Sequence, residues 1–474
     1  MLTYFLDKQS KIPLYEQLYT QIRDEIHQGI LVVNQQMPSK RHLSAHLKVS
    51  IQTIETTYDQ LVAEGYLRSI PRTGYFVEEA LLAPKKESQK TYSLLNQLRS
   101  EVTSFQFDLK TNAIDPLLFP SLIWAKMTRL VLSEANTQFW NQTELLGMKE
   151  LREGISNHLA RFRGMNVRPD QIVIGNGSEY LLGLISMMFP QELSIAVENP
   201  SYIKISKLYQ AYGRKIESIE LDQYGLNIKQ LRESNASIVH ITPSHQFPTG
   251  KVMPIKRRLE LLQWAHEKPN RFIIEDDYDS EFRFTGQPIP SLHGLEAHHQ
   301  VIYLNSFSKT LAPALRMGFM VLPVTLMTQF QEQLGFFSCP VPNVEQATLA
   351  YFMKKGHFER HLFRMRMAYK FRRDALIHAL NQSLISPFIE IQGEDAGLHF
   401  LLYVKCNVTG TQLVSLAKTA GIRLQSIQEY AVQKQLIDEP ILVIGYADLQ
   451  EKLITSMVSS LEKVWGPCLG LLEK

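Results

Sequence analysis

A lysine at position 309 lies in a setting that suits covalent chemistry. Lys309 follows an apolar run and a Ser-Phe-Ser segment, Arg316 comes shortly after it, and an earlier apolar run ends in Glu275-Asp276-Asp277-Tyr278. A lysine amine can form a Schiff base with an aldehyde, a carboxylate can keep a pyridinium nitrogen protonated, and hydroxyls with an arginine can neutralise a phosphate. The pattern predicts a pyridoxal phosphate site with Lys309 as its Schiff-base lysine.

Other polar residues can be given roles in the same site. Gly177, Ser178 and Glu179 follow an apolar run and are expected to open a helix, whose free N–H groups and dipole can receive the phosphate. Tyr202 suits stacking on the ring, although a packing role is open. The remaining predicted contacts are Asp276 with the ring nitrogen, Tyr278 with the ring oxygen, and Ser306, Ser308 and Arg316 with the phosphate. The alternatives are a solvated acidic loop at 276–278 and a surface lysine at 309.

The elements that must position these residues are strands of one sheet. Between residues 106 and 474, apolar runs at 171–174, 193–197, 238–241, 271–274 and 301–304 alternate with helical segments. Their apolar character is continuous, which favours mostly parallel strands covered by helices on both faces. Ligands of such α/β folds bind at the carboxyl ends of the strands, and the polar residues named above follow those ends.

The first 80 residues have a different pattern. An apolar residue recurs every fourth position from Leu14 to Ile26, which predicts a helix that Gly29 can end. Ser39 can cap a second helix, and a third follows Ser50 with Ile54, Tyr58 and Leu61 turned inward. Residues 66–77 read as two short strands around a Pro-Arg-Thr-Gly turn. Three helices and a hairpin make a winged helix-turn-helix; the alternative is a solvated helical bundle.

A winged helix-turn-helix places the start of its last helix against DNA bases and its wing against a groove or the backbone. The predicted partner is therefore double-stranded operator DNA. Lys40, Lys48 and Arg68 add local positive charge, and Gln52 can read an adenine. The predicted DNA-binding residues are Ser39, Arg41, Ser50, Gln52, Thr53, Arg72 and Gly74.

Length and composition agree with a two-part chain. Its 474 residues suit a small domain at 1–80, a polar linker at 81–105 with a short helical turn near 92–98, and a large domain at 106–474. The net charge of +3 is too small to imply DNA binding, which must come from local charge. Cys339, Cys406 and Cys468 are too far apart for a disulfide framework or a metal motif, so no metal is predicted. Without a signal core or a membrane-length apolar stretch, we expect a cytoplasmic protein.

Short sequence motifs in the first half of the chain, and the site pattern in the second, resemble those of known families. Pro13-Leu14-Tyr15, Met37-Pro38-Ser39-Lys40-Arg41, Ala63-Glu64-Gly65-Tyr66-Leu67 and Arg72-Thr73-Gly74-Tyr75-Phe76-Val77 resemble the GntR family of bacterial repressors. The second domain resembles fold-type I aminotransferases, and the whole chain resembles the MocR/GabR group, in which the two are fused. The resemblance implies pyridoxal phosphate binding and a homodimer that reads repeated or palindromic half-sites. Many relatives have an arginine after the serine that opens the recognition helix, where this chain has Ile51 and Gln52.

Two departures concern the effector. Enzymes of this fold usually have an Asn-Pro-Thr-Gly segment whose asparagine contacts the ring oxygen, and here Phe247 precedes Pro248. They usually carry an arginine for the substrate carboxylate in the last strand, and residues 441–446 contain none. Lys204 or Arg423 could replace it, or either could be a surface charge. The signal is then either pyridoxal phosphate itself, as in relatives that control its synthesis, or an amino-acid-like compound that reacts at a Lys309 imine.

Three functions remain open at this point. The first is a transcriptional regulator whose cofactor domain is a sensor. The second is a working aminotransferase with an accessory DNA-binding domain. The third is a plain GntR repressor whose large domain serves for dimerisation, which leaves the cofactor pattern unexplained.

Overall fold

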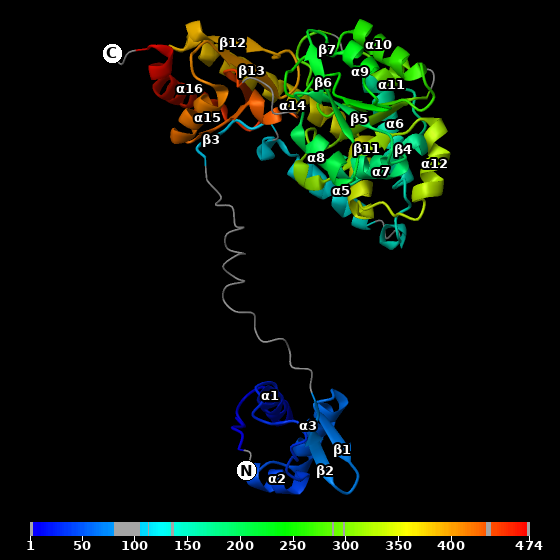
Figure 1. Cartoon of the computed structure of the whole chain (residues 1–474), viewed down its shortest axis with the longest axis vertical. Coiled ribbons are helices and arrows are strands. Elements are labelled where there is room, and N and C mark those ends of the chain that lie inside the picture. The colour runs from blue at the N-terminus through cyan, green and yellow to red at the C-terminus, as the bar shows by residue number, and fades with distance from the viewer. Residues whose placement is uncertain are drawn as a thin grey trace. The chain divides into compact units, whose positions relative to one another are not determined.

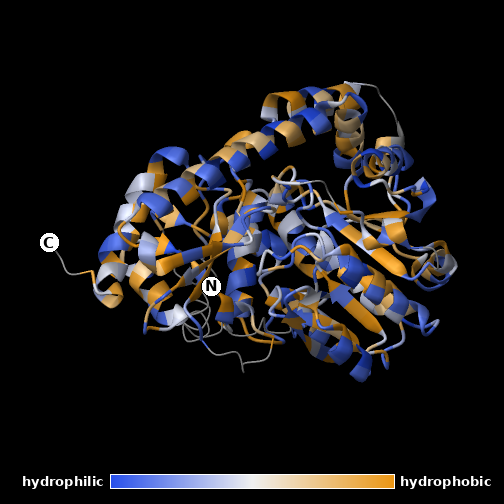
Figure 2. Ribbon diagram, turned by 90° about the horizontal axis from the view of Figure 1, so that it is seen from above, coloured by the Kyte–Doolittle hydropathy of each residue, from blue (hydrophilic) through white to orange (hydrophobic). Residues whose placement is uncertain are grey.

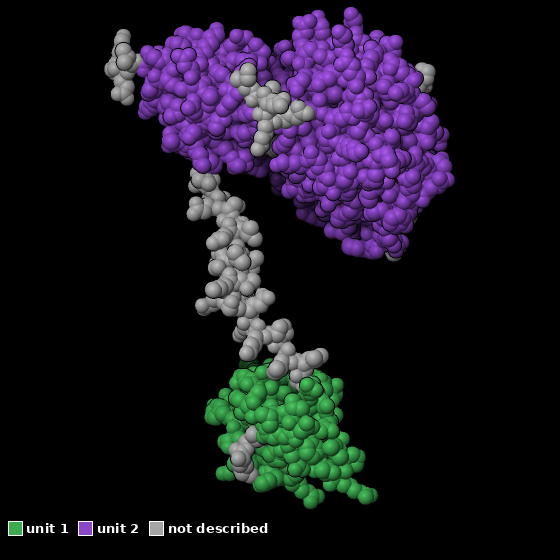
Figure 3. Space-filling view, viewed as in Figure 1, with its two compact units in different colours: residues 1–103 green, residues 104–474 purple. Residues whose placement is uncertain are grey.

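The computed structural model describes residues 3–79, 105–111, 113–133, 137–286, 289–296, 299–432 and 438–471. The chain forms two compact units, Met1–Thr103 and Ser104–Lys474, which are coloured separately in Figure 3. The predicted linker at 81–105 and its helical turn lie outside the described residues, apart from residue 105. Among the described residues, no helix is both long enough and apolar enough to span a membrane.

Unit 1 contains the predicted helices and hairpin (Figure 1). Ser39 and Ser50 cap the second and third helices, because their hydroxyls accept the N–H groups of His42 and Thr53. Leu18, Ile54 and Tyr58 are fully buried between the helices, as the apolar spacing predicts. The winged helix-turn-helix prediction is confirmed. Its elements are α1 (Leu14–His27), α2 (Lys40–Leu47), α3 (Ile51–Ala63), β1 (Leu67–Ile70) and β2 (Gly74–Val77).

The turns of unit 1 use left-handed backbone where the sequence has turn residues. Gly29 has a φ of 74° and follows the end of α1, and Gly65 has a φ of 79° between α3 and β1. Arg72 has a φ of 63° at the tip of the β1–β2 hairpin. A non-glycine residue in this region is uncommon, and the Arg72 side chain is exposed at the wing tip.

Unit 2 is built on a large mixed sheet. Five consecutive strands run parallel to one another: β10, β9, β8, β5 and β6. At the two edges the pairing is antiparallel, because β11 pairs antiparallel with β10 and β4, and β7 pairs antiparallel with β6. The mostly parallel prediction is confirmed. In order across the sheet the strands are β4 (Ile172–Gly175), β11 (Gly318–Val321), β10 (Val301–Ser306), β9 (Phe272–Asp276), β8 (Ile238–Ile241), β5 (Ile195–Asn199), β6 (Ile216–Asp222) and β7 (Gly225–Leu226).

Helices cover both faces of this sheet. Ile172 and Ile174 of β4 belong to one apolar cluster with α6 and α13, whereas Val173 belongs to another with α7 and α12. Figure 2 shows the central strands mainly in the hydrophobic colour, with mixed helices around them. Two-sided burial explains why the runs are continuously apolar. The helices of this lobe are α5 (Ser121–Ser133), α6 (Lys149–Arg163), α7 (Ser178–Met188), α8 (Ile203–Ala211), α9 (Ile228–Glu233), α10 (Ile255–His266), α11 (Leu292–Leu295), α12 (Val324–Leu334) and α13 (Asn343–Lys354).

A smaller lobe contains an antiparallel sheet in the order β12-β13-β16-β15, and a short parallel pair, β14 with β3. Phe400, Leu442 and Trp465 are buried in its core. The lobe brings the start of β13 to the large sheet, because His399 Nε2 donates to the carbonyl oxygen of Pro248 at 3.0 Å. Its elements are β3 (Phe107–Asp108), α14 (His357–Gln382), β12 (Ile389–Gln392), β13 (His399–Val404), α15 (Gly410–Thr419), β14 (Ile422–Arg423), β15 (Gln425–Ser426), β16 (Ile441–Gly445) and α16 (Glu451–Trp465).

Candidate functional site

A cavity of about 280 Å³ lies at the carboxyl ends of the large-sheet strands. Loops after β4, β5, β8, β9 and β10 all reach it, because parallel strands end at the same edge. The ten residues expected around a cofactor all line this one cavity: Gly177, Ser178, Glu179, Tyr202, Asp276, Tyr278, Ser306, Ser308, Lys309 and Arg316. Leu182, Lys204, Ile205, Leu208, Thr242, Phe247 and Pro313 complete the lining.

One end of the cavity has the features of an anion site. Helix α7 begins at Ser178, and the N–H groups of a first helical turn have no partner within the helix. Gly177 has a φ of 81°, and a Cβ there would lie 3.4 Å from the Arg316 guanidinium. Glycine therefore lets Arg316 pack close to the start of α7. Helix N–H groups, serine hydroxyls and a guanidinium are donors that suit a phosphate group.

Glu179 places a carboxylate beside these donors. Its Oε1 is 2.5 Å from the Lys204 ammonium and 3.6 Å from Arg316. The hydrogen bond from Lys204 lowers the pKa of Glu179 below its ordinary value. All three side chains are partly exposed, so this is a modest surface interaction. Lys204 is consequently paired and is not a free cation of the cavity.

At the other end, Asp276 stands at the end of β9 with its carboxylate supported from behind. His240 Nε2 lies 3.5 Å from Asp276 Oδ2, and His240 Nδ1 is 2.9 Å from the Tyr209 hydroxyl. Tyr209 and His240 are buried, so the imidazole beside the carboxylate has a fixed position. The sequence analysis did not predict that His240 and Tyr209 lie behind Asp276. The signal that could have found His240 is that it is a lone histidine within the apolar strand β8.

Lys309 follows β10 in the middle of the cavity lining. Its Nζ donates to the backbone oxygen of Thr111 at 2.6 Å. Burial lowers the pKa of Lys309 to about 8, and the nearby Asp279 carboxylate opposes that shift. A lysine with such a pKa is partly neutral near pH 8, which is the form that attacks a carbonyl group.

Phe247 and Tyr202 form an aromatic wall of the cavity. Their rings meet edge to face with centroids 5.7 Å apart. Behind them, the buried Glu198 accepts from the Thr242 hydroxyl at 2.8 Å and from the Thr242 N–H at 3.1 Å. Burial raises the pKa of Glu198 to about 7. Glu198, which the sequence places among the polar residues at the carboxyl end of β5, holds the start of the loop that carries Phe247.

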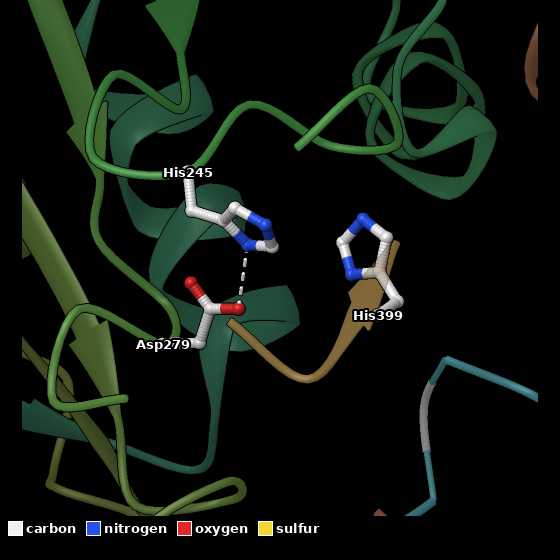
Figure 4. Close-up of side chains that lie close together, drawn as sticks. All are labelled: His245, Asp279 and His399. Atoms are coloured by element: carbon white, nitrogen blue, oxygen red, sulfur yellow. Dashed lines mark hydrogen bonds and ion pairs between the residues drawn. The ribbon is translucent and has the colours of Figure 1, made fainter. Parts of the chain in front are cut away.

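Tyr278 belongs to a buried hydrogen-bonded group below the cavity. Its hydroxyl is 3.0 Å from the carbonyl oxygen of His245, to which it donates, and 3.1 Å from His245 Nδ1. His245 Nδ1 is also 2.9 Å from Asp279 Oδ2, and the His399 ring lies beside it (Figure 4). Two histidines and a carboxylate are residue types that bind zinc. Here His245 Nδ1, Asp279 Oδ2 and His399 Nε2 are hydrogen-bonded to protein groups, and Lys309 adds positive charge nearby, which disfavours a cation.

Arg423 is not brought to the cavity. It lies in β14, where its guanidinium is 3.7 Å from Asp108 Oδ2. Val443, in the last strand where relatives of the fold carry an arginine, is buried in an apolar cluster with Phe247 and Leu401. Among the described residues that line the cavity, the cations are Lys204, Lys309 and Arg316.

In unit 1, the predicted DNA-binding residues lie on α2, α3 and the wing. Arg41, Gln52 and Arg72 are exposed. Ser39, Ser50 and Thr53 form the helix caps, and Gly74 begins β2. Two of the basic residues that were expected to add charge are instead paired within the domain: Lys40 with Glu55 at 2.7 Å and Arg68 with Glu78 at 3.2 Å.

Comparison with known proteins agrees with both units. Residues 14–77 match the family of bacterial regulatory proteins described as gntR, and residues 106–459 match aminotransferase class I and II. The structure also resembles a multiple-substrate aminotransferase from Thermococcus profundus, with a TM-score of 0.69 and 23% identity over 84% of this chain and 98% of that one. The fold and site thus define a helix-turn-helix protein with an aminotransferase-like domain.

Full-length relatives have the same two parts. The regulator YdeL of Bacillus subtilis is 35% identical over 98% of this chain and 99% of its own length. MocR of Rhizobium meliloti, a probable rhizopine catabolism regulatory protein, is 28% identical over 97% and 95%. PdxR of Corynebacterium glutamicum, a pyridoxine biosynthesis regulator, is 30% identical over 87% and 88%. The chain belongs to the MocR/GabR-type HTH transcriptional regulators of the GntR family.

Proposed function

We propose that this transcriptional regulator binds pyridoxal phosphate in the cavity and changes its affinity for operator DNA in response. One observation carries the proposal: the ten residues that suit the cofactor line a single cavity, in a chain that also has a winged helix-turn-helix. A domain that served for dimerisation alone would have no need of a buried lysine with a lowered pKa and an aspartate in the same cavity.

Each part of the cofactor has a complementary group in the cavity. The cofactor, when bound, supplies an aldehyde that condenses with an amine and a ring that withdraws electrons. Lys309 provides the amine, Asp276 holds the proton on the ring nitrogen, and Tyr278 donates to the ring oxygen. Ser178, Ser306, Ser308 and Arg316 bind the phosphate with the N–H groups of α7. Tyr202 packs on the ring.

We propose further that the cofactor itself is the signal. An amino-acid effector needs a cation for its carboxylate, and Lys204 is paired with Glu179 while Arg423 is paired with Asp108 outside the cavity. Val443 is apolar and buried. A relative whose name refers to pyridoxine biosynthesis supports the same interpretation. An amine without a carboxylate is the remaining class of small effector.

The assembly we propose is a homodimer that reads two half-sites on the operator. Leu117, Leu122 and Phe336 of unit 2 are large apolar residues that are at least 80% exposed. We place these side chains in the interface between the two copies, where their apolar surface would be buried. We place the DNA-binding domain at 1–80, the linker at 81–105 and the effector domain at 106–474. Two copies would present two recognition helices, which suits a palindromic or repeated operator.

Operator titrations test this function directly. Protein freed of cofactor, protein with pyridoxal phosphate, and protein with the cofactor plus a panel of amino acids and amines are compared on the same DNA. We expect a change in affinity with the cofactor alone, of about 5-fold to 150-fold if the coupling is typical of allosteric proteins. A response to one amino acid and none to the cofactor would contradict the cofactor-signal proposal and favour Lys204 as a carboxylate ligand.

Transaminase activity is the second candidate function. Lys309, Asp276 and Tyr278 are the groups that such activity needs, and all three line the cavity. An ordinary amino-acid substrate needs a cation to bind its carboxylate. Since Lys204 is paired with Glu179 and Arg423 lies outside the cavity, turnover of such substrates is disfavoured. Conversion of the cofactor to its amine form by any member of the panel, followed by absorbance and by keto-acid product, distinguishes an enzyme from a sensor.

A further inference from the structure

The loops after β8 and β9 meet in a buried hydroxyl–imidazole–carboxylate chain. The Tyr278 hydroxyl lies 3.1 Å from His245 Nδ1, which in turn lies 2.9 Å from Asp279 Oδ2. His245 and Asp279 are 1% and 2% exposed. A Cβ on Gly397 would overlap the His245 ring, so this glycine lets the backbone of the neighbouring loop pack against the imidazole. Imidazole and carboxylate therefore have little freedom to move.

The protons of this chain can be assigned from acceptor strength. A carboxylate is a stronger acceptor than a hydroxyl oxygen, so His245 Nδ1–H donates to Asp279. The other ring nitrogen of His245, Nε2, is buried and has no hydrogen-bond partner among the described residues. The Tyr278 hydroxyl donates to the His245 carbonyl oxygen. The carbonyl oxygen of His245 is thus the acceptor of the Tyr278 proton as long as no ligand oxygen in the cavity competes for it.

Two neighbouring residues of the cavity do not compete with Tyr278 as a donor to the ring oxygen. Phe247 occupies the place of the usual asparagine and has no polar side-chain atom. The Thr242 hydroxyl already donates to Glu198. The direction of the Tyr278 hydroxyl therefore matters, and it depends on the two atoms of His245 that the hydroxyl contacts, Nδ1 and the carbonyl oxygen.

Asp279 also acts on Lys309. Its carboxylate favours the charged form of the Lys309 amine, while burial and the charge of a protonated His399 would disfavour it. His399 is itself held neutral, because burial lowers its pKa well below the ordinary value. The titratable groups that surround His245, Asp279 and Lys309 are Arg163, Arg258, Asp276, Tyr278, Arg283, Arg316, Glu179, Lys204 and His399.

We propose that His245, held by Asp279 at 2.9 Å, is a positioning residue that directs the Tyr278 hydroxyl toward the cofactor ring oxygen. The Asp279 carboxylate of the same group also acts on the Lys309 amine. The proposal rests on the proposed function. An asparagine at position 247 would contact the ring oxygen directly. In this chain the His245–Asp279 pair acts on that oxygen through Tyr278 instead.

The first test needs no cofactor. Full-length protein freed of cofactor is treated with an amine-selective reagent across a pH series, and labelling of Lys309 is followed by peptide mass spectrometry. Asp279→Asn removes a negative charge, so the labelling midpoint should fall by about one pH unit, the lower end of the range for losing a nearby opposite charge. His245→Phe removes the N–H that Asp279 accepts, so more of the carboxylate's negative charge acts on Lys309 and the midpoint should rise by a smaller amount.

Two further variants control this test. His245→Gln keeps an N–H donor for Asp279 and should restore a midpoint near that of the unchanged protein. Glu281→Gln alters a buried carboxylate that hydrogen-bonds to Asn305, and it should leave the midpoint unchanged. Opposite shifts in Asp279→Asn and His245→Phe are not expected from loosened packing. Equal midpoints in all variants, or shifts in one direction, would overturn the proposal.

The second test uses protein loaded with pyridoxal phosphate. The pH at which the visible absorption changes is measured for His245→Phe, Tyr278→Phe and the double variant. If His245 acts through Tyr278, the double variant should shift no further than Tyr278→Phe. Fully additive shifts would overturn the proposal. A protein that never takes up the cofactor would instead contradict the proposed function, and the labelling test would still decide how His245 and Asp279 act on Lys309.

Discussion

The polar groups of the DNA-binding unit and those of the cavity in the large unit differ in whether they already have partners within the protein. Arg41 and Arg72 are exposed and have no ion-pair partner among the described residues of unit 1. In the cavity, Asp276, Tyr278 and Lys309 each have a defined protein partner. DNA is a large polyanion that cations reach from solvent, whereas a small ligand must find groups that already have their orientation.

This contrast has consequences for solution conditions. Exposed charges are screened by salt, and buried groups are screened much less. Desolvation instead moves the pKa values of the buried groups, so the cavity should respond to pH. Lys309 and Glu198 have pKa values of about 8 and 7, close to neutrality. We therefore expect salt to act mainly through the DNA-binding unit and pH to act through the cavity.

The largest expected effect comes from removing the amine of the cavity. Lys309→Ala should abolish covalent cofactor binding and the yellow colour that goes with it, while circular dichroism remains unchanged. Lys354→Ala, at the exposed end of α13, is the matched control and should keep the colour. A Lys309→Ala protein that keeps the covalent absorption band would assign the reactive amine to another lysine.

Asp276→Ala should weaken cofactor retention without removing Lys309. Loss of one partner from a buried charged pair costs about 2–5 kcal/mol. Dissociation of the cofactor during dialysis measures the effect. His240→Ala should have a smaller effect of the same sign, because His240 orients Asp276 from behind. Equal retention in Asp276→Ala and the unchanged protein would remove Asp276 from the cofactor site.

In the DNA-binding unit, Gln52→Ala should alter base preference. A bidentate contact of glutamine with adenine is worth about 1–3 kcal/mol of discrimination. Binding to a library of operator variants should show relaxed specificity at one base pair of each half-site. Gln60 of the same helix hydrogen-bonds to Glu64, and Gln60→Ala provides the control. An unchanged base preference would mean that Gln52 does not read the DNA.

Arg72→Ala and Arg41→Ala should weaken operator binding for all sequences alike. Removal of one cation from a DNA phosphate should reduce the slope of log affinity against log salt by about one. Arg23, which pairs with Asp24 on α1, is the control, and Arg23→Ala should leave the slope unchanged. If both wing and α2 variants keep the full slope, DNA approaches the domain from another side.

The smallest effect concerns pH. Attack on an aldehyde needs the neutral amine, and the Lys309 amine is protonated below its pKa of about 8. Cofactor capture by the free protein should therefore accelerate as pH rises toward 8 and level off above it. Stopped-flow absorbance measures the rate. Acceleration that continues to pH 10 would mean that Lys309 is not desolvated.

Local sequence was enough for the elements of unit 1, for five strands of the large sheet and for the ten residues expected to line one cavity. The fourth-residue apolar spacing in α1 and the serine caps of α2 and α3 act over a few residues, so they can be read without tertiary contacts. The predicted runs begin and end one or two residues before β4, β5 and β9 do. Backbone pairing extends these strands into polar residues such as Asn199 and Asp276, which apolar character alone does not include.

What only the tertiary structure decided is which charges are already paired. Lys204 meets Glu179 across 25 positions of sequence, and Arg423 meets Asp108 across a much longer separation. Residues such as His240, Glu198, His245 and Asp279 gain their significance from neighbours on other strands. The sequence by itself determined which side chains end at the shared edge of the sheet, because parallel strands converge there. Pairing and pKa depend on burial and on distances between remote segments, which packing alone fixes.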